Sequence, residues 1–216
     1  MMKKASEFVI VIDAGHQEKA DLEKEPIGFG AIEKKPKVAA GTKGVVTGLK
    51  EYQLNLQVSL KLQKLLEERG YKVVMIRTTN DVNISNSQRA EIANKCKADA
   101  FLRIHADFSE NPDDSGAMTI CQTSKNPYNK SLYAKSKSLS KAVLDNLVKA
   151  TGCSKRKILE TDTMTGINWC QVPVTIVEMG FMSNPKEDLA LANEEYQWKI
   201  VYGIANGIDA YFNSNE

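Results

Sequence analysis

The stretch VIVIDAGH, residues 9–16, is the strongest sign of architecture in this sequence. Its four consecutive β-branched residues predict a buried strand. His16 lies at the carboxyl end of that strand. Residues 100–107, AFLRIHAD, repeat the arrangement and carry His105 near their end. These are the only two histidines of the sequence. Because ligands of open α/β sheets bind where strands end, we predict that the two imidazoles meet at one site.

Strand-like and helix-like segments alternate along the rest of the chain. Apolar runs rich in valine and isoleucine occur at 8–12, 72–76, 100–104 and 172–177. Helical patterns fit residues 50–69, 86–97, 131–151, 185–192 and 194–212. This alternation is typical of a mostly parallel twisted sheet covered by helices on both faces. We therefore predict an α/β fold, a three-layer α/β/α sandwich of phosphorylase/hydrolase-like type, with residues 1–216 forming one catalytic domain.

The amino-acid composition and charge of the chain argue against several classes of protein. The apolar and charged fractions, 42% and 26%, are those of an ordinary globular chain. A net charge of +2 and the absence of any basic run longer than KKPK at 34–37 argue against nucleic-acid binding. The apolar run at the start is too short to span a bilayer or to form the core of a signal peptide, so we expect neither membrane insertion nor a visible export signal.

The four cysteines offer no metal or redox motif. Cys96, Cys121, Cys153 and Cys170 form no CxxC pair. A chain of this size does not need disulfides for stability, so we expect buried free thiols, with disulfides as the alternative.

Glu51 is a third candidate for a catalytic or metal-binding residue. In a helix over residues 50–69 it lies within about 20° of Val58 and Leu62 on the helical wheel, so its carboxylate faces the core. The structural alternative is an acid that stabilises the helix dipole from the first turn. Such an acid has no reason to face inward, and an unpaired buried carboxylate is costly, so we expect a cationic partner.

Glu178 is the fourth candidate, because it closes the apolar run VPVTIVE at 172–178. Its structural alternative is a salt bridge to Arg89 or Arg103. Each histidine taken alone also has a structural alternative, a hydrogen-bonded role without a metal.

Two imidazoles and one carboxylate can form the protein shell of a catalytic Zn²⁺, which leaves a fourth position for water. The metal brings the pKa of that water to about 7, and a further carboxylate can take its proton. No HExxH or other compact zinc motif is present, so the ligands must come from separated segments.

Other common catalytic and nucleotide-binding sites have less support in the sequence. No GxSxG elbow exists, and no GxGxxG follows the first strand. Residues 41–44, GTKG, lack the spacing of a phosphate-binding loop. Trp169 and Trp198 could line a groove, although packing in the core is the expected role of both. The stretch of about thirty residues after His16 is longer than most connections and is expected to be functional or mobile.

Four segments together resemble the zinc-dependent N-acetylmuramoyl-L-alanine amidases of the amidase_3 type. The first is VIVIDAGH, the second is GLKEYQLNLQVSLKLQKLLEERGYKVVMIRTTN, the third is SQRAEIANKCKADAFLRIHAD and the fourth is PVTIVEMGFMSNPKEDLAL. The resemblance implies that His16, Glu51 and His105 bind Zn²⁺ and that Glu178 is the catalytic carboxylate. It implies hydrolysis of the amide between the lactyl group of N-acetylmuramic acid and the L-alanine of the peptidoglycan stem peptide.

Two other functions stay open on the sequence. One is a peptidoglycan-binding or regulatory module that keeps the fold without turnover, which Asp107 suggests because it adds a carboxylate near the expected metal. The other is a zinc exopeptidase, although two-metal sites need more ligands than two histidines supply. Arg89 and Arg103 could bind stem-peptide carboxylates, and structural pairing is the role that we expect for both. The resemblance implies extracellular action at the cell wall, as in autolysins and phage endolysins.

Overall fold

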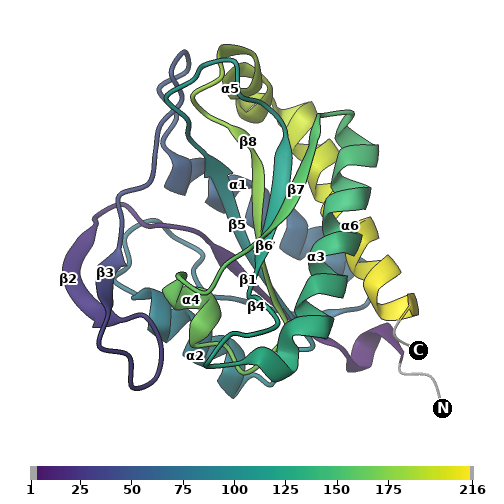
Figure 1. Ribbon diagram of the computed structural model, residues 1–216. Coiled ribbons are helices and arrows are strands. Elements are labelled where there is room, and N and C mark those ends of the chain that lie inside the picture. The colour runs from purple at the N-terminus through teal and green to yellow at the C-terminus, as the bar shows by residue number, and fades with distance from the viewer. Residues whose placement is uncertain (1–3, 215–216) are drawn as a thin grey trace.

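Six strands form the central sheet of the computed structural model, which describes residues 4–214 (Figure 1). In spatial order they are β4 (Lys72–Met75), β1 (Val9–Ala14), β5 (Ala100–Asp107), β8 (Val174–Phe181), β6 (Ala117–Cys121) and β7 (Lys155–Glu160). The first four run parallel to one another. β6 runs antiparallel to β8 and β7 runs parallel to β6, so the sheet is mixed at this edge.

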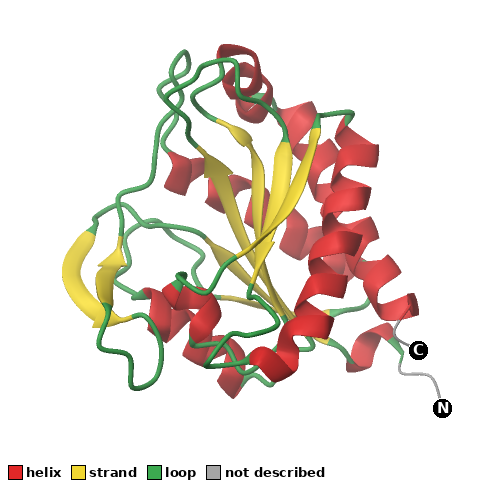
Figure 2. Ribbon diagram, viewed as in Figure 1, coloured by secondary structure: helices red, strands yellow, loops and turns green. Residues whose placement is uncertain are grey.

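Helices cover both faces of the sheet (Figure 2). One face carries α1 (Glu51–Glu68), α3 (Tyr133–Thr151) and α6 (Glu194–Ser214), and the other carries α2 (Asn86–Lys95) and the short α4 (Thr165–Asn168). The helix α5 (Pro185–Ala192) joins β8 to α6, and two short 3-10 helices occupy Ala5–Glu7 and Lys130–Leu132. The predicted three-layer α/β/α sandwich with a mostly parallel sheet is confirmed.

Strand β1 shows why the sheet needs helices on both sides. Ile10 and Ile12 are fully buried in the core beneath α1 and α6, whereas Val11 is fully buried in the second core, beneath α2. A strand buried on both faces is apolar at every position, which accounts for the unbroken VIVI run. Trp169 and Trp198 pack against these two cores, as expected.

Helix α1 carries the predicted apolar stripe, with Leu54, Val58 and Leu62 completely buried. It ends where the sequence predicts, because Gly70 follows the C-cap Arg69 with a φ of 90°. That left-handed conformation costs glycine little and other residues more, so Gly70 stops the helix.

The order of the strands changes direction at β1. From β1 the chain passes through α1 to β4 on one side, and then through α2 to β5 on the other side of β1. Helices α1 and α2 pack on opposite faces of the sheet, and β1 and β5 are neighbours at this change of direction. Such a switch point is where open α/β folds bind their ligands.

The long connection after His16 is a hairpin, formed by β2 (Asp21–Pro26) and β3 (Lys34–Val38). Trp169 Nε1 donates to the carbonyl of Pro26 at 2.9 Å, and Asn86 Nδ2 donates to the carbonyl of Lys37 at 2.8 Å. The segment predicted to be functional or mobile is thus tied to α2 and to the residue that follows α4.

The hairpin, the strands β6 and β7 and the short helix α4 were not predicted from the sequence. The predicted helices are otherwise close to those observed, and the helix predicted at 185–192 has the observed bounds. All four cysteines are free, as expected, but only Cys121 and Cys170 are buried. Within residues 4–214, no helix combines the length and the apolar character needed to cross a membrane.

Candidate metal centre and catalytic cleft

The four predicted site residues meet at the carboxyl edge of the parallel strands. His16 follows β1, His105 lies near the end of β5 and Glu178 lies on β8, the next strand along. His105 and Glu178 are register partners, and paired residues of neighbouring strands project from the same face. Glu51 is the first residue of α1 and approaches from that helix.

One carboxylate oxygen joins the two histidines. Glu51 Oε1 lies 3.1 Å from His16 Nε2 and 3.1 Å from His105 Nδ1. The helix thus aims Glu51 into the site, where its side chain is only 4% exposed. No lysine or arginine among the described residues contacts this carboxylate, and its side-chain partners are two imidazoles and an amide.

Further hydrogen bonds fix Glu51 in place. Its Oε2 accepts from the backbone N–H of Thr42 at 2.9 Å, and its Oε1 accepts from Asn55 Nδ2 at 3.2 Å and from the backbone N–H of Ala106 at 3.3 Å. Burial alone would raise the pKa of Glu51, but the hydrogen bonds from His105 and His16 hold it well below its ordinary value. Glu51 is therefore an anion at neutral pH.

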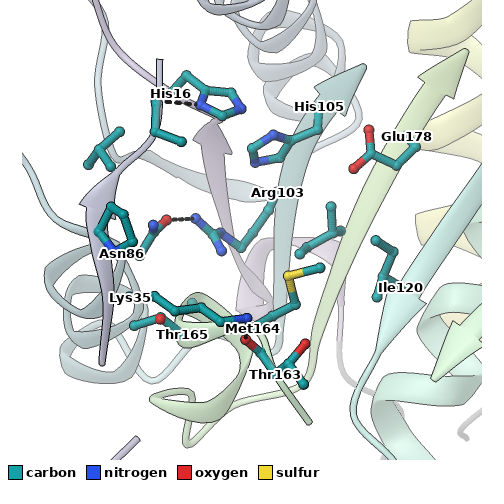
Figure 3. Close-up of a pocket in the computed structure, with 15 residues that line it drawn as sticks. His16, Lys35, Asn86, Arg103, His105, Ile120, Thr163, Met164, Thr165 and Glu178 are labelled. Carbon is teal, nitrogen blue, oxygen red and sulfur yellow. Dashed lines mark hydrogen bonds between the residues drawn. The ribbon is translucent and has the colours of Figure 1, made fainter. Parts of the chain in front are cut away.

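The backbone orients His16. Its Nδ1 donates to the carbonyl of Ala39 at 2.8 Å, the dashed contact at His16 in Figure 3, and its Nε2 lies 3.1 Å from Glu51 Oε1. Second hydrogen bonds of this kind set the tautomer and direction of metal-binding histidines. His16 also has a φ of 59°, a left-handed conformation that is uncommon for residues with a side chain. Such backbone is found at sites where surrounding contacts hold a residue for function.

The residue before His16 has to be glycine for a different reason. A Cβ at Gly15 would lie 2.2 Å from the His105 ring, far inside contact distance. The glycine in VIVIDAGH therefore makes room for the second histidine, a role that the sequence alone does not reveal.

The donor atoms of His16, Glu51 and His105 fit a metal ion. They lie within 4.8 Å of one another and form the one such cluster found among residues 4–214. Ligands at about 2.0–2.2 Å from a tetrahedral zinc ion lie about 3.3 Å apart, close to the separations between Glu51 and each histidine. Two imidazole nitrogens and a carboxylate oxygen are also ligands that Zn²⁺ prefers.

Glu178 stands beside this cluster without a partner. Its Oε2 is buried and has no hydrogen bond among the described residues, and neither Arg89 nor Arg103 forms the salt bridge considered as its structural alternative. Burial raises the pKa of Glu178 well above its ordinary value, and the charges of Glu51 and Asp107 raise it further. An unpaired carboxyl group with a raised pKa is suited to accept and return a proton.

Asp107 forms its hydrogen bonds with residues outside the His16–Glu51–His105 cluster. Its Oδ2 accepts from Arg156 Nη1 at 2.8 Å, and its Oδ1 accepts from the backbone N–H of Phe108 at 2.8 Å. Arg156 also lies over the ring of Phe181, 4.3 Å from its centroid. This carboxylate is thus paired with a cation.

Arg89 and Arg103 are paired with Asp13 behind the site. Arg89 Nη1 lies 2.6 Å from Asp13 Oδ1, and Arg103 Nε lies 2.9 Å from Asp13 Oδ2. Asp13 and Arg89 are completely buried. Structural pairing was the expected role of both arginines, but Arg103 also lines the cleft, as described below.

Several known proteins are similar to this chain over most of its length. The sequence profile of the Amidase_3 family, described as N-acetylmuramoyl-L-alanine amidase, matches residues 10–210. The uncharacterized protein YqiI of Bacillus subtilis is 32% identical over 168 residues, which covers 78% of this chain and 77% of YqiI. The germination-specific N-acetylmuramoyl-L-alanine amidase of the same organism is 27% identical, over 78% of this chain and 74% of its own length.

A solved structure agrees with these sequence matches. The catalytic domain of CwlV, an N-acetylmuramoyl-L-alanine amidase from Bacillus (Paenibacillus) polymyxa var. colistinus, superposes with a TM-score of 0.77 at 28% identity. The match covers 95% of this chain and 98% of that domain.

Proposed function

The chain belongs to the N-acetylmuramoyl-L-alanine amidase family, and from this premise we propose that it works as a zinc enzyme with Glu178 as its proton carrier. Its activity is that of the family, hydrolysis of the amide between the lactyl group of N-acetylmuramic acid and the L-alanine of the peptidoglycan stem peptide. The observation that carries the proposed mechanism is the convergence of His16, His105 and Glu51 beside the unpartnered Glu178.

In this proposal His16, Glu51 and His105 hold the metal. A zinc ion bound there supplies a Lewis acid for the scissile carbonyl and for water. The hydrogen bond from His16 to Ala39 and those from Thr42 and Asn55 to Glu51 keep the ligand atoms in place before the metal arrives.

Glu178 moves the protons. Its free oxygen takes a proton from the attacking water as the new carbon–oxygen bond forms at the lactyl carbonyl. The same carboxyl group then gives that proton to the alanine nitrogen as the carbon–nitrogen bond breaks. The immediate products are a lactyl carboxylic acid, which keeps the second proton of the water, and a stem peptide with a free amino terminus. The acid then ionises and the amine takes up a proton, so that a carboxylate and an ammonium group result.

The substrate sets where the enzyme works. Peptidoglycan lies outside the cytoplasmic membrane, so we place the action of this protein at the cell wall. The family match and the presence of all four site residues favour an enzyme over a binding module without turnover. The cluster among residues 4–214 holds three ligands, which suits one metal rather than the two-metal site of an exopeptidase.

Replacing Glu178 by Gln tests the mechanism. General acid–base catalysis contributes about 10²–10⁴-fold, so we expect Glu178→Gln to slow the release of stem-peptide amines by that factor while zinc content stays unchanged. Muropeptide digestion followed by mass spectrometry measures the bond cut, and metal analysis measures the zinc. Glu110→Gln makes the same chemical change on an exposed loop and should act like wild type. Wild-type rates from zinc-loaded Glu178→Gln would exclude this carboxyl group as the proton carrier.

A further inference from the structure

A cavity of about 270 Å³ opens directly beside the metal centre (Figure 3). His16, His105 and Glu178 line its reactive end. From there it extends between the hairpin strand β3 and the loop before α4, past Arg103 and toward Lys35. A substrate whose scissile bond lies at the metal centre would thus carry its adjoining groups past these two cations.

Arg103, which lines this cavity, belongs to a buried cluster with an excess of positive charge. Arg77, Arg89 and Arg103 form one cluster in which Asp13 is the one carboxylate that they contact among the described residues. The hydrogen-bond partners of Arg77 are all neutral, four backbone carbonyls and the side chain of Asn80. Burial and the nearby charge of Arg89 lower the pKa of Arg77 to about 10. Buried charge without a counterion is unfavourable, so this cluster favours an anion in the cavity.

Arg103 presents the excess charge to the cavity. Its Nε donates to Asp13 and its Nη2 donates to Asn86 Oδ1 at 2.7 Å, but its Nη1 has no partner among residues 4–214. A Cβ at Gly166 would lie 1.8 Å from this Nη1, so the glycine is needed to accommodate the guanidinium group. The arginine is 4% exposed and is held rigidly by its two other contacts. A fixed donor of this kind binds an anion with little loss of conformational freedom.

Lys35 adds a second cation from the hairpin. Its Nζ donates to the carbonyl of Thr163 at 2.8 Å, which draws the side chain across the cavity. An ammonium group has three donors, so two stay available for a ligand. The neighbouring Lys34 is exposed and does not line the cavity, as expected for alternating residues of a strand.

The chemistry of peptidoglycan identifies the anion. On the sugar side of the scissile bond the lactyl carboxyl group is consumed in the amide, so that side carries no free acid. On the peptide side the second stem residue is a D-glutamate linked through its γ-carboxyl group, and its α-carboxyl group is either free or amidated. We infer that the cavity, in the amidase proposed above, binds the free α-carboxylate of this second stem residue between Arg103 and Lys35.

Two substrates that differ in one group test this inference. N-acetylmuramyl-L-Ala-D-isoglutamate carries the free α-carboxylate, and N-acetylmuramyl-L-Ala-D-isoglutamine carries the amide. A charge-assisted hydrogen bond is about twice as strong as a neutral one, so we expect kcat/KM of the zinc-loaded wild type to favour the acid by about tenfold or more. Equal rates for the two substrates, or a preference for the amide, would overturn the inference.

Two lysine variants test whether the preference for the acid over the amide arises in this cavity. Lys35→Met should reduce the preference for the acid several-fold, mainly through KM of the acid. Lys34→Met removes the same charge from the adjacent exposed position and should keep the wild-type preference. If the two variants behave alike, Lys35 does not bind the carboxylate. Failure to release an amine from either substrate would instead contradict the proposed function.

Discussion

Asp13 is the residue on which the active-site scaffold depends most. It is completely buried, and its two oxygens accept from Arg89 and Arg103, which project from α2 and β5. Burial alone would raise the pKa of Asp13, but the charges of Arg89 and Arg103 hold it below the ordinary value of 3.8. One carboxylate thus joins the strands that carry both histidines to the helix behind them.

Asp13→Asn should destabilise the protein strongly at neutral pH. Breaking a buried ion pair by removing one partner costs about 3–5 kcal/mol, which corresponds to a fall in Tm of roughly 6–20 °C for a chain of this size. The control is Asp81→Asn, in a loop where the side chain is exposed. Thermal unfolding followed by circular dichroism measures the difference.

The loss of folding stability caused by Asp13→Asn should become smaller at low pH. Because the folded-state pKa of Asp13 is lowered, its stabilising contribution is fully present above the unfolded-state value of about 4. The contribution is lost as the pH falls below that value toward the lower folded-state pKa. Urea unfolding between pH 7 and pH 3 should therefore show the gap between wild type and Asp13→Asn narrowing below about pH 4. A gap that stays constant to pH 3 would contradict this account.

At the scale of elements, the β2–β3 hairpin forms one wall of the cleft and depends on a buried acid. Glu25 is 7% exposed, and its carboxylate accepts from the backbone N–H of Ser87 at 3.0 Å and from the Ser87 hydroxyl. Ser87 lies in the first turn of α2, where the helix dipole favours a negative charge. This contact secures the strand β2 to the body of the protein.

Glu25→Ala should loosen the hairpin without unfolding the protein. Hydrogen bonds to charged groups contribute about 1.5–3 kcal/mol, so local opening should become about 10- to 100-fold more frequent. Hydrogen exchange of the amides at 21–38 measures this opening directly. Glu33→Ala, at an exposed position of the same hairpin, is the control. Unchanged exchange at 21–38 in Glu25→Ala would show that other contacts hold the hairpin.

The hairpin and the strand β7, which the sequence did not reveal, share a physical cause. The central strands β1, β5 and β8 are buried, so their apolar runs predict them. β7, with the sequence KRKILE, is the edge strand of the sheet and is partly exposed, and the hairpin strands DLEKEP and KKPKV are mostly polar. Strands of this kind are formed by pairing and by contacts with distant residues, which no local pattern records.

The four candidate site residues were predictable because their positions at strand ends and on a helix face are local. Their supporting contacts were not. Ala39 acts through its backbone carbonyl, and Asn86 and Lys35 reach the cleft from a helix and a hairpin far away in sequence. Such contacts depend on the register and packing of the whole fold.

At the scale of the whole molecule, the proposed metal centre joins three distant segments. His16, Glu51 and His105 come from a strand end, a helix start and a second strand. Those residues are far apart in an unfolded chain, so a metal that binds them together binds the folded state selectively. Zinc should therefore stabilise the whole fold as well as enable catalysis.

Chelation should lower Tm, and it should do so only when the site is intact. Zinc at about 1,000 times its Kd stabilises a protein by about 4 kcal/mol, so its removal from the wild type should lower Tm by roughly 8–16 °C. Because the sequence has no third histidine, His16→Ala or His105→Ala should lose most zinc affinity and show little change on chelation. Scanning calorimetry with and without chelator, together with metal analysis, measures both effects. Zinc retained at wild-type affinity by both variants would exclude the site.

The contact between His16 Nδ1 and the carbonyl of Ala39 has a consequence for how such enzymes diversify. This contact brings together the two ends of the connection that contains the β2–β3 hairpin, because residue 16 precedes the hairpin and residue 39 follows it. An insert whose ends meet can be lengthened, shortened or grafted from a relative with little disturbance of the framework on either side. The one requirement is that any replacement must return a backbone carbonyl to the same point beside the imidazole. Substrate preference and metal binding can therefore be exchanged separately in this scaffold.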